Sequence, residues 1–202
     1  MRGLYLVTPD WDDTEKLLAA SEQAIEGGAT LLQYRHKTAN ESLRLEQAFA
    51  LLSLCRRLNV PLIINDHLDL CMHIDADGIH LGGTDASVAN ARKQIGTEKI
   101  IGASCYGDLQ LARDATAAGA SYVAFGGFYP SRVKKYEVAT SPSMITQALV
   151  EISIPLCVIG GMTPQNARPL IELGAYAVAA ISSVYAAENH RRAAAEFAAL
   201  FR

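Results

Sequence analysis

The 202-residue sequence lacks the basic excess, the paired cysteines and the long apolar segments that mark several protein classes. Its 18 lysines and arginines against 21 aspartates and glutamates give a net charge of −3, whereas nucleic-acid-binding domains usually carry a strong basic excess. We therefore expect no nucleic-acid partner, although a local basic site is compatible with this balance. The four cysteines form no CxxC pair, which favours buried free thiols in a reducing cytoplasm.

A membrane-spanning segment is also missing from the sequence. The longest stretch without a charged residue, 115–131, is interrupted by three glycines and a proline, whereas a transmembrane helix needs about 20 apolar residues. The first residues, MRGLYLVTPDW, carry one basic residue and a short apolar run, so we expect no signal peptide. These absences predict a soluble cytoplasmic protein with no membrane partner. A chain of this length can form a single domain over residues 1–202.

What the sequence does contain is a series of eight short apolar runs, most of them continuous rather than alternating. Such runs are typical of parallel strands that are buried on both faces. They are Gly3–Thr8, Leu31–Arg35, Pro61–Asp66, Gly78–Gly82, Ile100–Cys105, Tyr122–Phe128, Pro155–Gly161 and Ala177–Ser182. The segments between these runs have apolar residues at helical spacing, for example Glu15–Glu26 and Glu41–Leu58. A last helix is predicted over Ala186–Phe201.

Helix boundaries support an alternating architecture. Asp13 or Thr14 can cap the first predicted helix, Asn40 can cap the second, and Thr163-Pro164 can begin another. Eight strands alternating with helices fit either a closed (β/α)₈ barrel or an open doubly wound sheet. The count of eight, and the absence of GxGxxG after the first strand, favour a compact single-domain (β/α)₈ TIM barrel of the α/β class.

Polar residues at the carboxyl ends of the strands are the candidate site residues, because barrel active sites are built there. The second strand ends in QYRHK, where alternation places Gln33, Arg35 and Lys37 on one side. Two cations pointing into a barrel mouth predict an anionic ligand. The alternative is that Arg35 and Lys37 are solvated or pair with nearby carboxylates.

Carboxylates follow the third and fourth strands, which are neighbours in a barrel. Asp66 ends the third run and Asp85 follows the fourth, so the two aspartates can converge. Two carboxylates with water and phosphate oxygens suit Mg²⁺, whereas the alternative for each is a helix cap. Ser104, at the end of the fifth run, can donate a hydrogen bond to a ligand or cap a helix.

Glycine, serine and basic residues follow the last three strands. The sixth run continues into GGFYPSRVKK, which is typical of a loop that closes over phosphate, although a solvated basic loop is the alternative. Gly160-Gly161 and Ser182-Ser183 follow the seventh and eighth runs, where barrels commonly bind phosphate through backbone N–H groups. The pattern predicts a metal-bound diphosphate and a separate monophosphate. The simplest chemistry is displacement of pyrophosphate by a monophosphorylated second substrate. The histidines form no metal-binding pattern, and we interpret them as structural.

These motifs together resemble a known family. YLVT, QYRHK, IIND, DGIHLGGTD, IGAS, GG-FYPS-RVKK, PLCVIGGMTPQN and AISS occur in the order found in thiamine phosphate synthases, from Tyr5 to Ser183. The resemblance implies a (β/α)₈ barrel that joins 4-amino-5-hydroxymethyl-2-methylpyrimidine diphosphate to 4-methyl-5-(2-phosphoethyl)thiazole. Thiamine phosphate is formed and pyrophosphate is released with the help of Mg²⁺.

The resemblance also implies roles for individual residues. Asp66 and Asp85 correspond to the Mg²⁺ ligands. The residues implied to bind the pyrimidine diphosphate are Gln33, Tyr34, Arg35, His36, Lys37, Asn65, Ser104 and Lys134. Those implied to bind the thiazole phosphate are Ser131, Arg132, Val133, Gly161, Ile181 and Ser182. We expect Arg35, Lys37, Ser104 and Lys134 to be the catalytic residues.

Several positions depart from the family pattern. Gly83 replaces a glutamine, Ser131 and Val133 replace threonines, and Cys105-Tyr106 replaces a pair in which the family often has histidine. Val133 has no side-chain donor, so the thiazole phosphate contact there must come from the backbone or from Arg132.

Two alternative functions stay open. A thiazole tautomerase shares the fold, but it generally lacks the paired aspartates, and its catalytic histidine follows the fifth strand, where this chain has Tyr106. A non-catalytic sensor of phosphorylated ligands would need no clamp of Asp66, Asp85 and Lys134. Both patterns favour the synthase. A homo-oligomer is compatible with the sequence.

Overall fold

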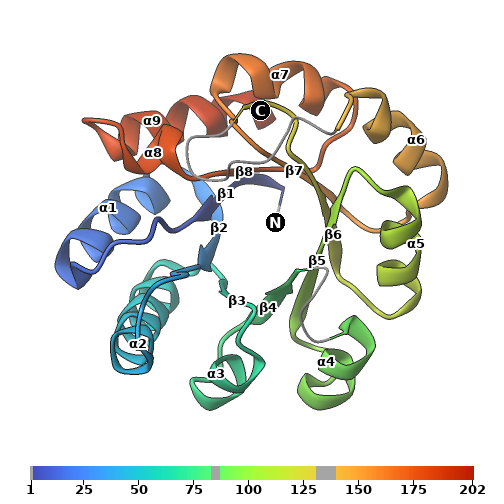
Figure 1. Ribbon diagram of the computed structural model, residues 1–202. Coiled ribbons are helices and arrows are strands. Elements are labelled where there is room, and N and C mark those ends of the chain that lie inside the picture. Colours follow the sequence, from blue (N-terminus) through green and yellow to red (C-terminus); the bar gives the residue numbers. More distant parts are fainter. Residues whose placement is uncertain (1, 83–86, 131–139) are drawn as a thin grey trace.

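The computed structural model describes residues 2–82, 87–130 and 140–202, in which eight parallel strands close into a barrel and helices surround it (Figure 1). Each strand pairs with its neighbours in the sequence, and β1 pairs with β8 to complete the ring. The strands are β1 (Gly3–Val7), β2 (Ala29–Tyr34), β3 (Leu62–Asn65), β4 (Gly78–Leu81), β5 (Ile100–Tyr106), β6 (Tyr122–Phe125), β7 (Leu156–Ile159) and β8 (Ala177–Ala180).

The helices form an outer layer around this ring. They are α1 (Thr14–Glu26), α2 (Glu41–Leu58), α3 (Leu68–His73), α4 (Val88–Ile95), α5 (Leu109–Ala117), α6 (Ser143–Glu151), α7 (Pro164–Glu172), α8 (Ser182–Tyr185) and α9 (His190–Ala198), followed by the 3₁₀ turn η1 (Ala199–Phe201). No helix in these parts of the chain is long and apolar enough to cross a membrane.

The predicted barrel is confirmed, and the differences lie at the ends of elements. Asp13, Asn40 and Thr163 cap α1, α2 and α7 through their side chains, as the sequence predicts. The helix predicted over Ala186–Phe201 begins later, because Asn189 caps α9 and a separate short helix, α8, precedes it.

The hydrophobic core consists of two clusters separated by the wall of the barrel. Alternate strand residues point outward against the helices, and the others point into the barrel. Tyr5, Leu31, Ile63 and Tyr122 fill much of the interior, whereas the other inward residues of β6, β7 and β8 are small. These are Ala124, Cys157, Ala177 and Ala179. Small side chains leave room above the filled layer, at the carboxyl ends of the strands.

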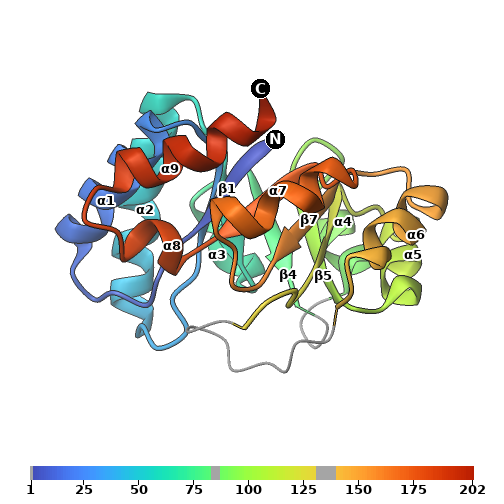
Figure 2. The same cartoon turned by 90° about the horizontal axis from the view of Figure 1, so that it is seen from above.

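The two ends of the barrel have different surroundings. The start of β1 and the C-terminus lie at one end, and the carboxyl ends of the strands lie at the other (Figure 2). The candidate site is therefore built at the end remote from both chain ends, on the short segments that follow the strands.

Candidate active site

Two adjoining pockets open at the carboxyl ends of the strands. The polar pocket is lined by Gln33, Arg35, Lys37, Asn65, Asp66 and His80, among others. The glycine pocket is lined by Gly126, Gly127, Gly160, Gly161, Ser182 and Ser183, among others. Both pockets share Ser104, Tyr106, Ala124, Ile159 and Ala179. Two ligands bound side by side would meet at this shared wall.

Arg35 is a buried cation that is held from two sides. Its Nη1 donates to Asp10 Oδ1 at 3.2 Å, and only 10% of its side chain is exposed. Its backbone N–H and carbonyl both bond to the Thr8 hydroxyl, at 2.8 and 2.9 Å. The guanidinium Nε is buried and has no hydrogen-bond partner in the described part of the chain. A buried N–H without a partner in a pocket suits an anionic ligand.

Lys37 and Asp66 form an ion pair at the rim of the polar pocket. Lys37 Nζ donates to Asp66 Oδ2 at 2.7 Å, and Asn65 Nδ2 donates to the same oxygen at 2.6 Å. Asp66 adopts a left-handed backbone conformation with φ +66°, which aspartate tolerates better than most residues. Asp10 links this pair to Arg35, because its Oδ1 also accepts from the Lys37 backbone N–H at 2.9 Å.

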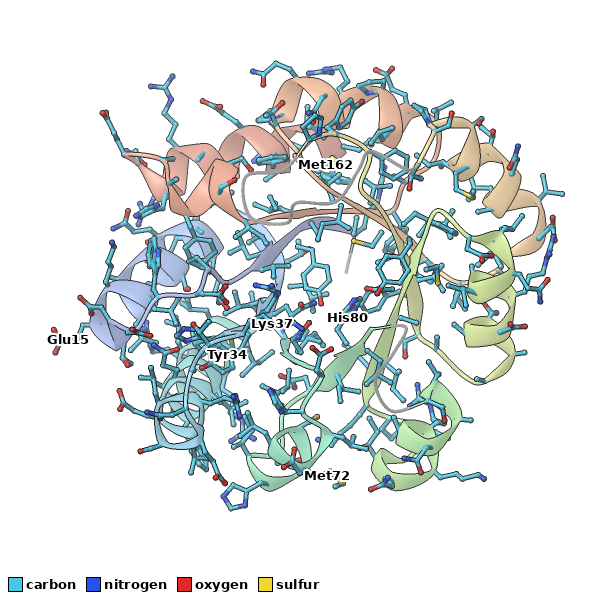
Figure 3. The ribbon with its side chains drawn as sticks, viewed as in Figure 1. Glu15, Tyr34, Lys37, Met72, His80 and Met162 are labelled. Carbon is cyan, nitrogen blue, oxygen red and sulfur yellow. The ribbon has the colours of Figure 1, made fainter. Side chains whose placement is uncertain are left out.

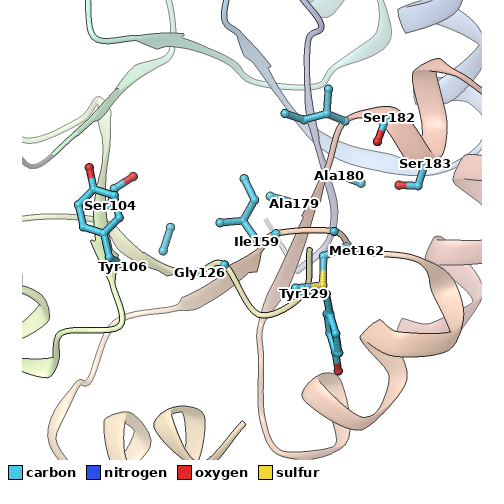
Figure 4. A pocket seen from close by; sticks show the side chains of 15 residues that line it. Ser104, Tyr106, Gly126, Tyr129, Ile159, Met162, Ala179, Ala180, Ser182 and Ser183 are labelled. Carbon is cyan, nitrogen blue, oxygen red and sulfur yellow. The ribbon is translucent and has the colours of Figure 1, made fainter. Parts of the chain in front are cut away.

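Ser104 lies at the junction of the two pockets, near the carboxyl end of strand β5. The pairing of β5 with β6 shifts register between Ser104 and Tyr106, and Tyr106 has φ +52°. Such bulges redirect side chains beside active sites. Figure 4 shows Ser104 and Tyr106 on one side of the glycine pocket, with Ser182 and Ser183 on the other.

A chain of hydrogen bonds crosses the barrel interior beneath the polar pocket. Gln33 Nε2 donates to Tyr5 OH at 2.6 Å, and Tyr5 OH bonds to Tyr122 OH at 2.7 Å. Tyr122 OH lies 2.8 Å from His80 Nδ1, and His80 Nε2 lies 2.9 Å from Ser104 Oγ. The chain therefore ends on a candidate catalytic hydroxyl.

At the floor of the glycine pocket, the backbone conformation and the close packing favour glycine over other residues. Gly161 has φ +59°, and a Cβ atom there would lie 2.3 Å from the Pro130 carbonyl oxygen. Because the glycines carry no side chains, the polar surface of this pocket consists of backbone groups and of hydroxyls that include those of Ser104, Ser182 and Ser183. Cys157 also lines the polar pocket, but burial raises the pKa of its thiol to about 12, so it is not a nucleophile at neutral pH.

Comparison with known proteins adds an independent observation. The family model described as thiamine monophosphate synthase matches residues 4–184 of the chain. The chain belongs to the thiamine monophosphate synthase family. It is 62% identical over 201 residues to a thiamine-phosphate synthase of Janthinobacterium sp. (strain Marseille), covering 100% of this chain and 97% of that protein. Identity to the Nitrosospira multiformis thiamine-phosphate synthase is 49%, with 99% and 86% covered.

A solved structure supports the same assignment to the thiamine monophosphate synthase family. The thiamine phosphate pyrophosphorylase from Pyrococcus furiosus superposes with a TM-score of 0.86 at 31% sequence identity, covering 98% of this chain and 95% of that one. The resemblance seen in the sequence motifs is thus confirmed.

Most site residues expected for a thiamine monophosphate synthase come together in the two pockets. Gln33, Arg35, Lys37, Asn65, Asp66 and Ser104 line the polar pocket, and Gly161, Ile181 and Ser182 line the glycine pocket. Asp85, Ser131, Arg132, Val133 and Lys134 lie outside the described residues, as does Gly83. Their predicted roles stay predictions.

Tyr34 and His36 are placed differently from the rest of the QYRHK motif. Tyr34 OH donates to Gln47 Oε1 at 3.0 Å, and His36 Nδ1 lies 3.2 Å from the same oxygen. Figure 3 shows Tyr34 beside α2, whereas Lys37 and His80 lie over the centre of the barrel. Both residues line a third cleft between β2 and β3, which shares Lys37, Asn65 and Asp66 with the polar pocket. Their contacts with α2 suit a role in anchoring the motif.

Sequence reasoning missed four residues that organise the site. Asp10 holds Arg35 and the Lys37 backbone, while Tyr5, Tyr122 and His80 connect Gln33 to Ser104. His80 was expected to be structural. A detectable signal was the alternation in β4 and β6, which places His80 and Tyr122 on the inward face.

Proposed function

We propose that this chain condenses 4-amino-5-hydroxymethyl-2-methylpyrimidine diphosphate with 4-methyl-5-(2-phosphoethyl)thiazole, forming thiamine phosphate and pyrophosphate. The observation that carries the proposal is the pair of pockets that share one wall. A cationic pocket beside a glycine-lined pocket can hold a diphosphate and a monophosphate next to each other. The family membership and the relatives' names support the same reaction.

The polar pocket is suited to the pyrimidine diphosphate. In the described part of the chain, Arg35 keeps unused guanidinium N–H groups after it has bonded to Asp10, and Lys37 adds a second cation at the rim. Guanidinium and ammonium groups bind phosphate oxygens strongly. Gln33 and Asn65 supply amide groups to the same pocket for the pyrimidine ring.

The residues at the rim also fit a Mg²⁺ ion. Mg²⁺ prefers one or two carboxylates, with water and substrate phosphates completing its shell, so a cluster of three or more protein ligands is not required. Asp66 offers a carboxylate that is 17% exposed beside the two cations, and Asp85 is the second proposed ligand. When bound, the ion would supply charge neutralisation for the departing pyrophosphate.

In the proposed reaction the bond between the pyrimidine CH₂ carbon and the diphosphate oxygen breaks, and its electron pair leaves with pyrophosphate. The lone pair of the thiazole nitrogen forms the new carbon–nitrogen bond. That nitrogen carries no proton, so no general base is needed. The protein's contribution is to bind both substrates at the shared wall, orient them, and stabilise the leaving charge with Arg35, Lys37 and Ser104.

The thiazole tautomerase is the second candidate, and the observations favour the synthase over it. The tautomerase's catalytic histidine position is occupied by Tyr106, whose side chain is 42% exposed. The Janthinobacterium and Nitrosospira relatives, which match 100% and 99% of this chain, are both thiamine-phosphate synthases.

We also propose that the enzyme works in the cytoplasm. Its four cysteines, Cys55, Cys71, Cys105 and Cys157, are free and buried, which suits a reducing compartment.

The decisive experiment is to mix the purified protein with both substrates and Mg²⁺. We expect thiamine phosphate and pyrophosphate to appear in equal amounts, and no product when the diphosphate is replaced by the pyrimidine monophosphate. A folded protein that forms no thiamine phosphate would contradict the proposal. Formation of an isomerised thiazole phosphate from a tautomeric precursor would favour the tautomerase.

Gly161→Ala tests the glycine pocket. A Cβ atom would press on the Pro130 carbonyl, and φ +59° is unfavourable for alanine by about 1–2 kcal/mol. We expect the KM for the thiazole phosphate to rise roughly tenfold, as for a loss of about 1.4 kcal/mol in binding. The KM for the pyrimidine diphosphate should change much less. Steady-state kinetics with each substrate varied in turn measures both constants.

Gly96→Ala is the matched control for this prediction. Gly96 has φ +76°, but no atom of the described residues lies within 4 Å of the added Cβ, and it follows α4 away from the pockets. Its ψ of −170° places it in a backbone region almost confined to glycine, so Gly96→Ala should carry at least as much backbone strain as Gly161→Ala, with unchanged kinetics. Equal KM values for the thiazole phosphate in Gly161→Ala and wild type would remove Gly161 from the proposed site.

A further inference from the structure

We infer that the hydrogen-bonded chain Gln33–Tyr5–Tyr122–His80 is a positioning device that aims the hydroxyl hydrogen of Ser104 at the junction of the two pockets. The four bonds measure 2.6, 2.7, 2.8 and 2.9 Å and join residues from strands β2, β1, β6, β4 and β5. The orientation of the Ser104 hydroxyl can be tested by itself, whereas its effect on the reaction rests on the proposed role of Ser104 in binding the leaving group.

The direction of the chain is set at its Gln33 end. The Nε2 group of an amide can only donate, so Tyr5 OH is the acceptor in the first bond. The Tyr5 hydrogen is then used toward Tyr122, and the Tyr122 hydrogen toward His80 Nδ1. This is the arrangement in which every phenolic hydrogen of the chain has an acceptor among the described residues.

The bond from Tyr122 selects one tautomer of the His80 ring. Its Nδ1 accepts from Tyr122, so the ring proton resides on Nε2 and is donated to Ser104 Oγ. Because Ser104 Oγ accepts this hydrogen bond from His80, the Ser104 hydroxyl hydrogen points toward a different acceptor. Since Ser104 lines both pockets, that hydrogen is available to an oxygen atom of a ligand at their shared wall.

Packing holds the members of the chain in place. Tyr5 and Tyr122 meet edge to face, with ring centroids 5.8 Å apart, and His80 stacks on Tyr122 with an interplanar angle of 23°. Gly102 makes room for this arrangement, because a Cβ atom there would lie 2.0 Å from Tyr122 Cζ. The rings therefore have little freedom to rotate away from their partners.

The same burial keeps both phenols in the form that can donate. Tyr5 and Tyr122 are nearly inaccessible to solvent, and burial raises the pKa of each hydroxyl above the ordinary phenol value. The chain therefore orients a donor without transferring a proton, which agrees with a reaction that needs no general base. Ser104 is the member of the chain that contacts the leaving group, and Tyr5, Tyr122 and His80 act through it.

The tautomer of His80 can be measured in the substrate-free protein. In ¹⁵N NMR of histidine-labelled protein, the signal that disappears in His80→Gln is assigned to His80. We expect this signal to have the chemical shifts of the Nε2–H tautomer. In Tyr122→Phe, which removes the donor to Nδ1, this form should lose its dominance. An Nδ1–H tautomer or an imidazolium in the wild-type protein at pH 7.5–8 (about one unit or more above the ordinary histidine pKa) would overturn the proposed direction.

Kinetics tests whether the chain acts through Ser104. We expect Tyr122→Phe to lower kcat about tenfold, the upper range for loss of one hydrogen bond, with a KM for the thiazole phosphate close to that of the wild type. Tyr5→Phe lies one link further away and should lower kcat less. In a Ser104→Ala background, Tyr122→Phe should have no further effect on kcat.

Ser21→Ala is the matched control, because it also removes one hydroxyl from a buried hydroxyl pair. Ser21 Oγ lies 2.8 Å from Tyr185 OH, in the helical layer outside the barrel, and it should leave kcat unchanged. An equal loss of kcat from Tyr122→Phe in both backgrounds would show a structural role and overturn the inference. A fully active Ser104→Ala enzyme with His80 still in the Nε2–H form would instead refute the proposed role of Ser104, and with it the function of the chain. If Tyr122→Phe fails to fold, the wild-type tautomer and the kcat of Tyr5→Phe still decide the matter.

Discussion

Asp66→Asn is expected to lower kcat roughly 100-fold to 1000-fold, the range seen when one preorganised stabiliser of transition-state charge is removed. Asparagine tolerates the left-handed backbone at φ +66° and has nearly the same shape, so the barrel should fold normally. What disappears is the negative charge beside Lys37 and the proposed Mg²⁺ ligand. We therefore also expect the Mg²⁺ concentration for half-maximal activity to rise by at least about tenfold.

Asp75→Asn provides the control, because Asp75 is also left-handed, with φ +55°, and also accepts from a lysine, Lys99 Nζ, at 2.5 Å. It follows α3 and lies outside the two pockets, so both kcat and the Mg²⁺ requirement should stay at the wild-type values. Titration of Mg²⁺ in a steady-state assay gives both quantities. An Asp66→Asn enzyme with an unaltered Mg²⁺ requirement would show that Asp66 is not a metal ligand.

The architecture could be predicted from the sequence because its signals are local. A continuous apolar run identifies a strand buried on both faces, and a side-chain cap such as Asn40 marks the start of a helix. The boundaries near the C-terminus were less predictable. The alanine-rich segment after β8 has helical composition throughout, and only the cap at Asn189 separates α9 from α8.

Part of the site could be predicted for the same reason. Alternation along β2 correctly places Gln33, Arg35 and Lys37 on the inner side, and the strand-end rule places Asp66 and Ser104 at the mouth. The hydrogen-bonded chain was beyond such reasoning, because Tyr5 and Tyr122 are 117 residues apart and their contact depends on closure of the barrel. The sequence alone also left open whether Arg35 and Lys37 pair with carboxylates. In the structure both do, with Asp10 and Asp66.

Those two ion pairs explain how a barrel of low net charge can present cations to a diphosphate. A buried cation without a partner would be costly, and a nearby carboxylate stabilises it before the ligand arrives. Asp10 bonds to one Nη of Arg35 and leaves the other guanidinium N–H groups for a second anion. The carboxylate therefore holds the guanidinium in place rather than saturating it.

Arg35→Met tests this arrangement, because methionine keeps most of the apolar stem and removes the charge. We expect kcat/KM for the pyrimidine diphosphate to fall roughly 100-fold to 1000-fold, as when one partner of a buried, hydrogen-bonded charge pair is lost. The KM for the thiazole phosphate should change little, since Arg35 lines only the polar pocket of the two. Part of any loss in stability arises from Asp10, which is left without its cation.

A second substitution separates the two effects. Arg35→Met combined with Asp10→Asn removes the unpaired carboxylate, so the midpoint of thermal unfolding should recover while kcat/KM stays low. Arg57→Met is the surface control: Arg57 pairs with Glu22 on the outer helices, and loss of such an exposed pair costs about 0–1 kcal/mol. If the double variant regained activity along with stability, Arg35 would serve the fold rather than the diphosphate. A persistent defect in a stable barrel is the result expected of a residue that binds the leaving group.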